Sequence, residues 1–160
     1  MSSHPQTPAS IGGASLAPHP LASLVREHQL LGELAQALSI FSECFTSQHA
    51  LVDRDDLAKF ARVFRDLGDY MHHEKEETVL LPLLAHLGFA WQDGPVAEVR
   101  QEHCQERYLV DVLCQAAEQE GDWNEDQRRR VGATALAMAE FQRAHLRKEN
   151  TELFPVILQR

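Results

Sequence analysis

Residues 72–82, with the sequence HHEKEETVLLP, align without a gap with residues 145–155, HLRKENTELFP, 73 positions further along the chain. In both segments a histidine precedes a glutamate by four positions: His72 and Glu76, then His145 and Glu149. Residues four apart lie on the same face of a helix, one turn from each other. Each segment therefore presents an imidazole and a carboxylate to one point. Two such turns in one small domain predict a site for a pair of metal ions.

The apolar residues around these segments predict four helices. Apolar positions recur every three to four residues in four stretches, which turn residues and acidic clusters separate. The first expected helix begins near residue 18 or 20 and runs to about residue 45; the second begins after the acidic cluster at 53–56 and stops near Gly88. The third runs from Gly94 to Gly121, and the fourth begins near residues 123–124. No stretch alternates as a β-strand does, so we predict an all-α, up-down-up-down four-helix bundle.

The length of 160 residues is typical of one domain. Residues 1–17, MSSHPQTPASIGGASLA, are rich in Ser, Pro and Gly, and we expect a disordered N-terminal tail there, followed by the bundle over residues 18–160. The tail has no basic start and no continuous apolar stretch, so a signal peptide is not expected. No apolar run in the sequence approaches the length that spans a membrane.

The charge and the cysteines limit the partners and the compartment. Lys+Arg number 15 and Asp+Glu number 24, which gives a net charge of −9 and argues against nucleic acid or an anionic membrane surface as a partner. Cys44, Cys104 and Cys114 form no CxxC motif and leave one thiol unpaired in any disulfide scheme. This use of cysteine predicts a reducing compartment, hence a cytoplasmic location.

The heights of the histidines in the expected bundle place them in one layer. In antiparallel neighbours, residues at equal distances from the connecting turn lie at the same height. The midpoint of His28 and His72 is residue 50, and that of His103 and His145 is residue 124; both fall in expected turns. One layer should therefore hold six side chains: His28, His72, Glu76, His103, His145 and Glu149.

Four imidazoles and two carboxylates on otherwise apolar stripes must be paired or must bind metal. Nitrogen and oxygen ligands without thiolate suit iron, manganese or zinc, and six ligands exceed the four of a closed zinc site. We expect His28 and His72 on one ion and His103 and His145 on the other, with the two glutamates bridging them. The alternative, ordinary helix-surface pairs of His and Glu, accounts for one such pair better than for two in matching repeats.

The neighbours of these residues receive weaker predictions. His73 and Glu77 align with Leu146 and Asn150, so both are expected beside the layer rather than in it. His86 is expected to be a helix-end histidine. Glu106 lies one turn from His103 on the inward stripe, where it is either a further ligand or ligand partner, or an exposed residue.

At these residues the chain resembles the hemerythrin family, specifically the bacterial hemerythrin-like cation-binding (HHE) domains, over about residues 18–160. The motifs that carry the resemblance are Glu27-His28, His72-x-x-x-Glu76-Glu77 before Leu-Pro, Glu102-His103, and His145-x-x-x-Glu149 before Leu-Phe-Pro. The resemblance implies a four-helix bundle with a non-haem centre of two Fe ions that binds dioxygen or a related small molecule. The resemblance also implies that the six residues named above are the iron ligands.

Two departures from the oxygen carriers of that family affect the expected function. Those carriers have a second histidine four residues after the one that matches His103, where this chain has Arg107; they also place an aspartate five residues after the last histidine, whereas Glu149 follows by four. A guanidinium cannot ligate a cation. We therefore expect Arg107 to turn aside, toward Glu106 or Glu102, and to leave a coordination position open on one ion.

The sequence thus favours a di-iron domain that binds a small diatomic ligand, oxygen or nitric oxide, for sensing, storage or stress response. One alternative is a di-iron enzyme that handles oxygen or peroxide, with Tyr70, Tyr108 and Glu106 as candidate proton donors. Iron storage or delivery, and a structural bundle stabilised by zinc, are further alternatives.

Overall fold

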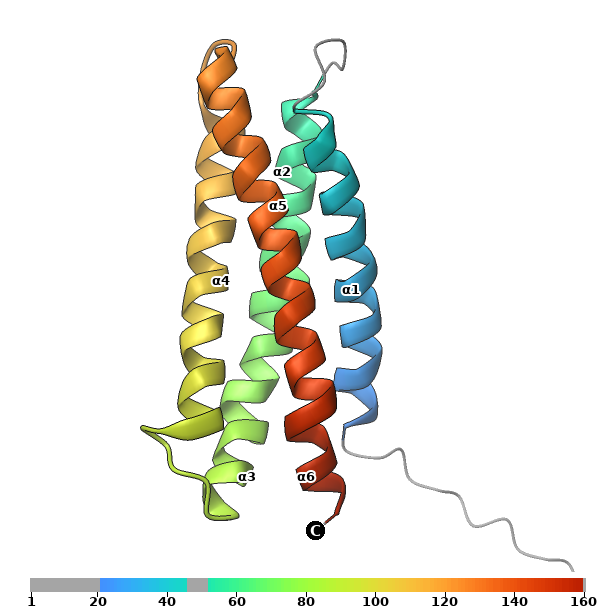
Figure 1. Cartoon of the computed structure of the whole chain (residues 1–160), viewed down its shortest axis with the longest axis vertical. Coiled ribbons are helices and arrows are strands. Elements are labelled where there is room, and N and C mark those ends of the chain that lie inside the picture. Colours follow the sequence, from blue (N-terminus) through green and yellow to red (C-terminus); the bar gives the residue numbers. More distant parts are fainter. Residues whose placement is uncertain (1–20, 46–51, 160) are drawn as a thin grey trace, which may run out of the picture.

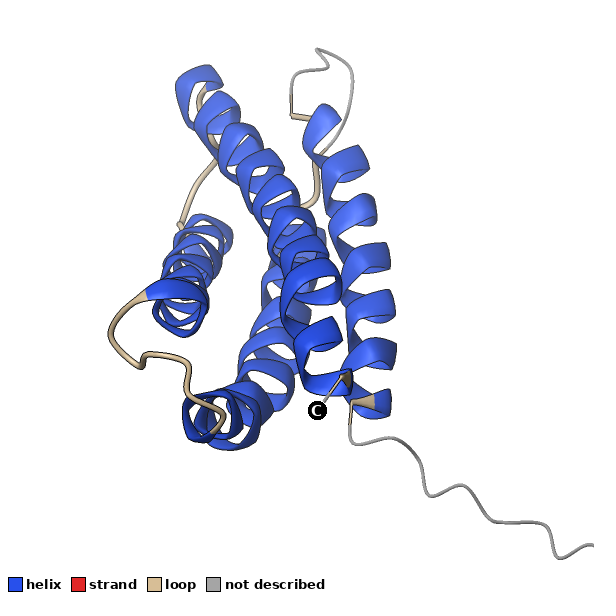
Figure 2. Cartoon of the chain, turned by 60° about the horizontal axis from the view of Figure 1, so that its bottom comes forward, coloured by secondary structure: helices blue, strands red, loops and turns tan. Residues whose placement is uncertain are grey.

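A computed structural model of the chain describes residues 21–45 and 52–159, and the expected tail at 1–17 lies outside them. The described part consists of four helical rods without a strand (Figures 1 and 2), which confirms the all-α prediction. The first rod is α1 (Ala22–Glu43) and the third is α4 (Gly94–Glu118). The second joins α2 (Arg54–Val63), η1 (Phe64–His73), η2 (Glu76–Leu80) and α3 (Leu81–His86). The fourth joins α5 (Glu125–Lys148), η3 (Glu149–Leu153) and α6 (Phe154–Leu158).

The rods form an antiparallel ring. Helix α1 packs against α5 and η1, while α4 packs against α2, η1 and α5. Successive rods run up and down alternately (Figure 1), so the up-down-up-down bundle is also confirmed. This arrangement lets each rod contribute side chains to a common interior.

Polar caps and glycines set the helix ends. The Asp53 side chain accepts a hydrogen bond from the backbone of Asp55 at 2.8 Å and begins α2. Asn124 and Gln127 form a capping box at the start of α5, in which each side chain bonds the other's backbone N–H. Gly88 and Gly121 have φ of 98° and 75°, the left-handed conformation that suits a residue beyond a helix end. These are the two turns at which the sequence predicted the second and third helices to end.

Three stretches of wide helical turns interrupt the second and fourth rods. In η1, η2 and η3 the backbone N–H bonds the carbonyl five residues earlier, as in Glu74 to Asp69, Leu81 to Glu76 and Phe154 to Glu149. Such π-helical turns hold an extra residue and rotate the side chains that follow. Apolar spacing in the second expected helix (Leu57, Phe60, Phe64, Leu67 and Met71) predicts that Met71 faces the interior. This prediction is wrong, because Met71 is 51% exposed while its neighbours His72 and His73 are both buried.

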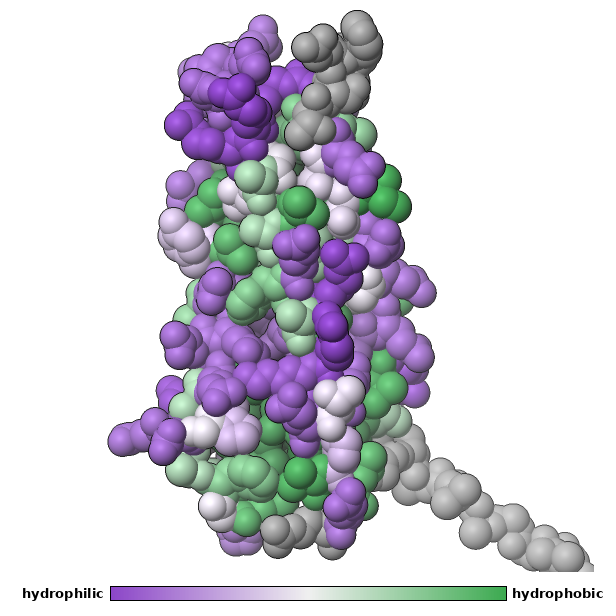
Figure 3. Space-filling model, viewed as in Figure 1, coloured by the Kyte–Doolittle hydropathy of each residue, from purple (hydrophilic) through white to green (hydrophobic). Residues whose placement is uncertain are grey.

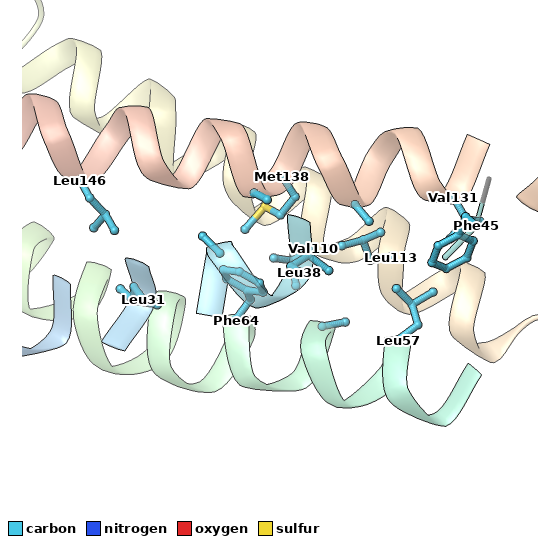
Figure 4. Packing of buried hydrophobic residues seen from close by; sticks show 14 residues of the cluster. Leu31, Leu38, Phe45, Leu57, Phe64, Val110, Leu113, Val131, Met138 and Leu146 are labelled. Carbon is cyan, nitrogen blue, oxygen red and sulfur yellow. The ribbon is translucent and has the colours of Figure 1, made fainter. Parts of the chain in front are cut away.

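Two apolar clusters fill the bundle on either side of a polar layer. The larger cluster (Figure 4) occupies the end with the α4–α5 turn and contains Leu31, Ala35, Leu38, Phe45, Leu57, Ala61, Phe64, Val110, Leu113, Val131, Ala135, Met138, Ala139 and Leu146. The smaller cluster lies at the other end and contains Leu21, Leu24, Leu80, Leu81, Leu84, Val96, Val99, Leu153 and Phe154. On every rod the buried histidines and glutamates fall between the members of the two clusters. Solvent is thus excluded from the polar layer at both ends.

The outer surface is mixed in polarity. Hydrophilic residues cover the end of the bundle at the α4–α5 turn, and more apolar residues show toward the end with α3 and α6 (Figure 3). Within residues 21–45 and 52–159, none of the helices combines the length and the apolar character needed to cross a membrane.

Two glycines inside helices provide a matched test of this packing. A Cβ added at Gly132 would lie 2.7 Å from Cβ of Phe45, whereas one added at Gly32 would meet nothing within 4 Å. We expect Gly132→Ala to destabilise the protein by about 1–3 kcal/mol, because α5 must move away from α1. Gly32→Ala should instead stabilise it by up to about 1 kcal/mol through helix propensity. Chemical denaturation of both variants measures the difference, and equal stabilities would contradict the close α1–α5 contact.

Candidate metal centre

All six side chains that the sequence assigns to one layer meet there, and each is at most 4% exposed. One comes from α1, two from the second rod, one from α4 and two from the fourth rod. They are His28, His72, Glu76, His103, His145 and Glu149.

The distances between their polar atoms are those of ligands around shared ions. Nε2 of His28 lies 3.3 Å from Glu149 and 3.7 Å from Glu76. The Nε2 atoms of His72 and His103 lie 3.4 and 3.2 Å from Glu76, and that of His145 lies 3.5 Å from Glu149. Two ligands about 2.0–2.2 Å from one ion lie roughly 3.0–3.5 Å apart. The centre therefore needs little rearrangement to hold cations.

The donors form two overlapping groups. One contains His28 and His72, the other contains His103 and His145, and Glu76 and Glu149 belong to both. In each group one ligand atom per residue lies within 4.8 Å of all the others. This arrangement could hold two ions with the two carboxylates between them.

The inward polar atoms of the centre have no hydrogen-bond partner within the described part of the chain. Among the described residues, ten buried side-chain nitrogen and oxygen atoms have no hydrogen-bond partner; eight belong to these six residues and the other two to the neighbouring His73. They include both oxygens of Glu76 and both of Glu149. Burial and the charge of Glu149 raise the pKa of Glu76 above its usual range. Since each unsatisfied buried group costs roughly 1–3 kcal/mol, the donor set itself calls for a cation.

The pKa values of the four imidazoles shift in two directions. Burial and the neighbouring histidines lower the pKa of His72 to about 2 and also lower the pKa of His103, so both rings stay neutral. At His28 and His145 burial lowers the pKa too, but the carboxylates in contact with them outweigh it and raise the pKa to about 9. Metal ligation requires neutral imidazole. Binding of metal should therefore displace protons from His28 and His145.

A second ring of polar residues orients the imidazoles. Each of the four directs Nε2 inward, while Nδ1 contacts an outer acceptor at 2.8–3.2 Å: Asn150 for His28, Glu27 for His72, Glu77 for His103 and Glu102 for His145. Every outer carboxylate also pairs with a cation, Glu27 with Lys75, Glu77 with Arg107 and Glu102 with Lys148. An acceptor on Nδ1 fixes the tautomer that leaves Nε2 free for a metal.

These contacts repeat between the two halves of the bundle. Glu27 on α1 bonds His72 and Lys75, and Glu102 on α4 bonds His145 and Lys148, the equivalent residues of the second repeat. The contact of His28 with Asn150 matches that of His103 with Glu77. The sequence repeat is thus an approximate two-fold symmetry of the centre.

The structure corrects the prediction for His73 and shows that Glu106, left open by the sequence, is buried. His73, expected beside the layer, is fully buried in it and stacks on His103 with ring centroids 3.9 Å apart. Glu106, which the sequence left open, is 2% exposed and lies 3.4 Å from Nε2 of His73. Its two oxygens face the Gln142 amide nitrogen at 2.5 and 2.7 Å, in the amide orientation that satisfies both groups.

Arg107 turns away from the centre, as the sequence predicts, but toward other partners. Its Nε donates to Asp69 at 2.5 Å and its Nη2 donates to Glu77 at 2.8 Å, across the groove to the second rod. Burial opposes its charge, but these two carboxylates outweigh that effect and raise the pKa of Arg107 further above its usual value. It therefore stays a cation and does not coordinate.

A pocket of about 250 Å³ leads from the surface to this side of the centre. It lies between η1 and α4, with Tyr70, Asp69 and Arg107 among its walls and His73 and Glu106 at its buried part. Small molecules could reach the centre here.

Comparison with known proteins identifies a cation-binding family. The family model described as "Hemerythrin HHE cation binding domain" matches residues 19–157. No curated protein and no solved structure matches the chain.

Glu77 tests the role of the outer ring. From the aligned repeats alone, Glu77 is expected beside the layer, with no role in metal binding. Its contact with Nδ1 of His103 predicts instead that Glu77→Ala lowers metal affinity roughly 10–100-fold. Glu74→Ala, an exposed position on the same rod, is the matched control and should leave affinity unchanged. Competition with a chelator measures both. Equal affinities in the two variants would show that Glu77 does not orient His103.

Proposed function

Because the chain belongs to the hemerythrin HHE cation-binding domain family, we propose that its buried layer holds two iron ions and that this centre binds dioxygen or nitric oxide. His28 and His72 ligate one ion and His103 and His145 the other. Glu76 and Glu149 bridge the two. The biological role of such a centre is sensing, storage of the small ligand, or a stress response.

The observation that carries this proposal is the set of unsatisfied buried donors. The inward atoms are imidazole nitrogens and carboxylate oxygens, and no thiolate is among them. Such donors suit iron, and in di-iron bundles they come from facing helices, as they do here. Four helical rods that place these atoms 3.2–3.7 Å apart account for two ions better than for one.

Binding of a small ligand requires free positions and access. Two imidazoles and two bridging carboxylates supply each ion with four protein donors, fewer than the six of an octahedral ion. The pocket between η1 and α4 reaches the buried side chains next to the centre. A diatomic molecule is small enough for that path.

The pocket also favours one alternative, an enzyme that handles oxygen or peroxide. Glu106 lies at its buried part and Tyr70 lines it at the exposed side, so a carboxyl group and a phenol lie along the path. Groups of this kind can deliver protons to a reacting molecule. Tyr108, the third candidate from the sequence, is 67% exposed and is not among the residues that line this pocket.

The cysteines bear on the compartment in which the protein works. Cys44, Cys104 and Cys114 are free thiols in the structure, as a reducing environment allows. We propose a cytoplasmic location, with a small molecule rather than a nucleic acid as the ligand.

Metal content tests the centre directly. Protein purified from iron-replete cells should hold close to two iron ions per chain, and a His72→Ala/His145→Ala variant should hold far less, because each ion loses an imidazole. His86→Ala is the control, since His86 is exposed on α3, and should match the unmodified protein. Zinc in place of iron would support the structural alternative, and equal iron in all three proteins would contradict the ligand assignment.

The response to nitric oxide separates binding from storage. Addition of nitric oxide to the reduced, iron-loaded protein should change its visible absorption in proportion to the iron content. An unchanged spectrum would contradict the binding function and favour storage or a structural role. Under the enzyme alternative the same protein consumes peroxide over many turnovers, and Glu106→Gln slows that consumption while nitric oxide still binds.

A further inference from the structure

The approximate symmetry of the centre is broken on one side. On the side of α4 and η1 the interior contains His73 and Glu106, whereas the symmetry-related positions in the other half are Leu146 and Leu31. Leu146 and Leu31 belong to the larger apolar cluster. The fold therefore accepts leucine at such positions, and packing does not explain two polar groups there.

His73 is the more unusual of the two. It is fully buried, and neither of its ring nitrogens has a hydrogen-bond partner among the described residues. Its Nδ1 lies 3.9 Å from the nearest Asp69 oxygen, too far for a hydrogen bond. An imidazole buried without partners costs free energy that leucine would not. A metal ion held together with His103 and His145 would be a partner for this ring.

The position of the ring fits that partner. One nitrogen of His73 lies within 4.8 Å of ligand nitrogens of both His103 and His145. The rings of His73 and His103 are stacked, with their planes 15° apart and their centroids 3.9 Å apart. The 3.4 Å between Nε2 of His73 and Glu106 falls within the range seen between the other donors of the centre.

We propose that His73 is a third imidazole ligand of the ion that His103 and His145 hold. This proposal rests on the proposed di-iron function. The ion on the α4–α5 side then has three imidazoles and the ion of His28 and His72 has two. With Arg107 turned away, the ion on the α4–α5 side still has a third imidazole, because η1 buries two consecutive histidines, His72 and His73.

The test exchanges His73 for the residue of the other half. In His73→Leu the metal-free protein should keep or gain thermal stability, since an unsatisfied polar ring leaves the core. The affinity for one of the two irons should fall more than about 100-fold, beyond the loss of about 10–100-fold that removal of an outer partner causes. Mössbauer spectra should show two different iron sites in the unmodified protein and more similar sites in any variant that retains both irons. His86→Leu is the matched control and should change none of these.

The outcomes separate this inference from the proposed function. Unmodified protein without iron would contradict the proposed function itself. Two irons in the unmodified protein, with the same affinity and spectrum in His73→Leu, would overturn only the role of His73. If His73→Leu does not fold, as judged by circular dichroism, His73→Gln is measured in the same way, because an amide keeps polarity but offers no imidazole nitrogen.

Discussion

The whole structure depends on a buried layer of nitrogen and oxygen donors that the protein itself leaves unsatisfied. Two apolar clusters close the layer at both ends, so water does not reach it along the bundle axis. Ten such atoms, at roughly 1–3 kcal/mol each, are a large cost beside the roughly 5–15 kcal/mol that stabilises a domain. Metal binding and folding are therefore coupled in this bundle.

The outer ring makes this layer specific for a cation. An acceptor on each outward Nδ1 turns Nε2 toward the centre, and three of the four acceptors are carboxylates. Lysines and Arg107 neutralise those carboxylates from outside, so that negative charge does not accumulate at the surface of the site. The same contacts tie α1 to the second rod and α4 to the fourth, which links the orientation of the ligands to the packing of the bundle.

The difference between the two halves concentrates polarity on one side. Where one half has leucine, the other has His73 and Glu106, a pocket and the paired Arg107. Two ions in an otherwise symmetric frame would thus have different surroundings. Any difference between them in ligand binding should arise on the side of η1 and α4.

The sequence by itself determined the features that depend on local periodicity. Apolar spacing and turn residues predicted four helices, and the i,i+4 repeat with equal heights placed six side chains in one layer. Their ligation of iron stays a prediction, as does the tail at residues 1–17. These successes share a cause, because helical spacing is short-range and antiparallel rods must match in height around their turns.

Only the tertiary structure decided which neighbours join the layer. The alignment put His73 outside the layer, although the aligned Leu146 is itself buried in the regular helix α5. Apolar spacing put Met71 inside because it assumed a regular α-helix, and the π-helical turns of η1 add a residue that leaves Met71 exposed. Arg107 turns aside as predicted but reaches Asp69 and Glu77 rather than Glu106 or Glu102, since its long side chain crosses to the adjacent rod. Contacts between rods cannot be obtained from spacing along one helix, because they depend on how the rods are rotated against each other.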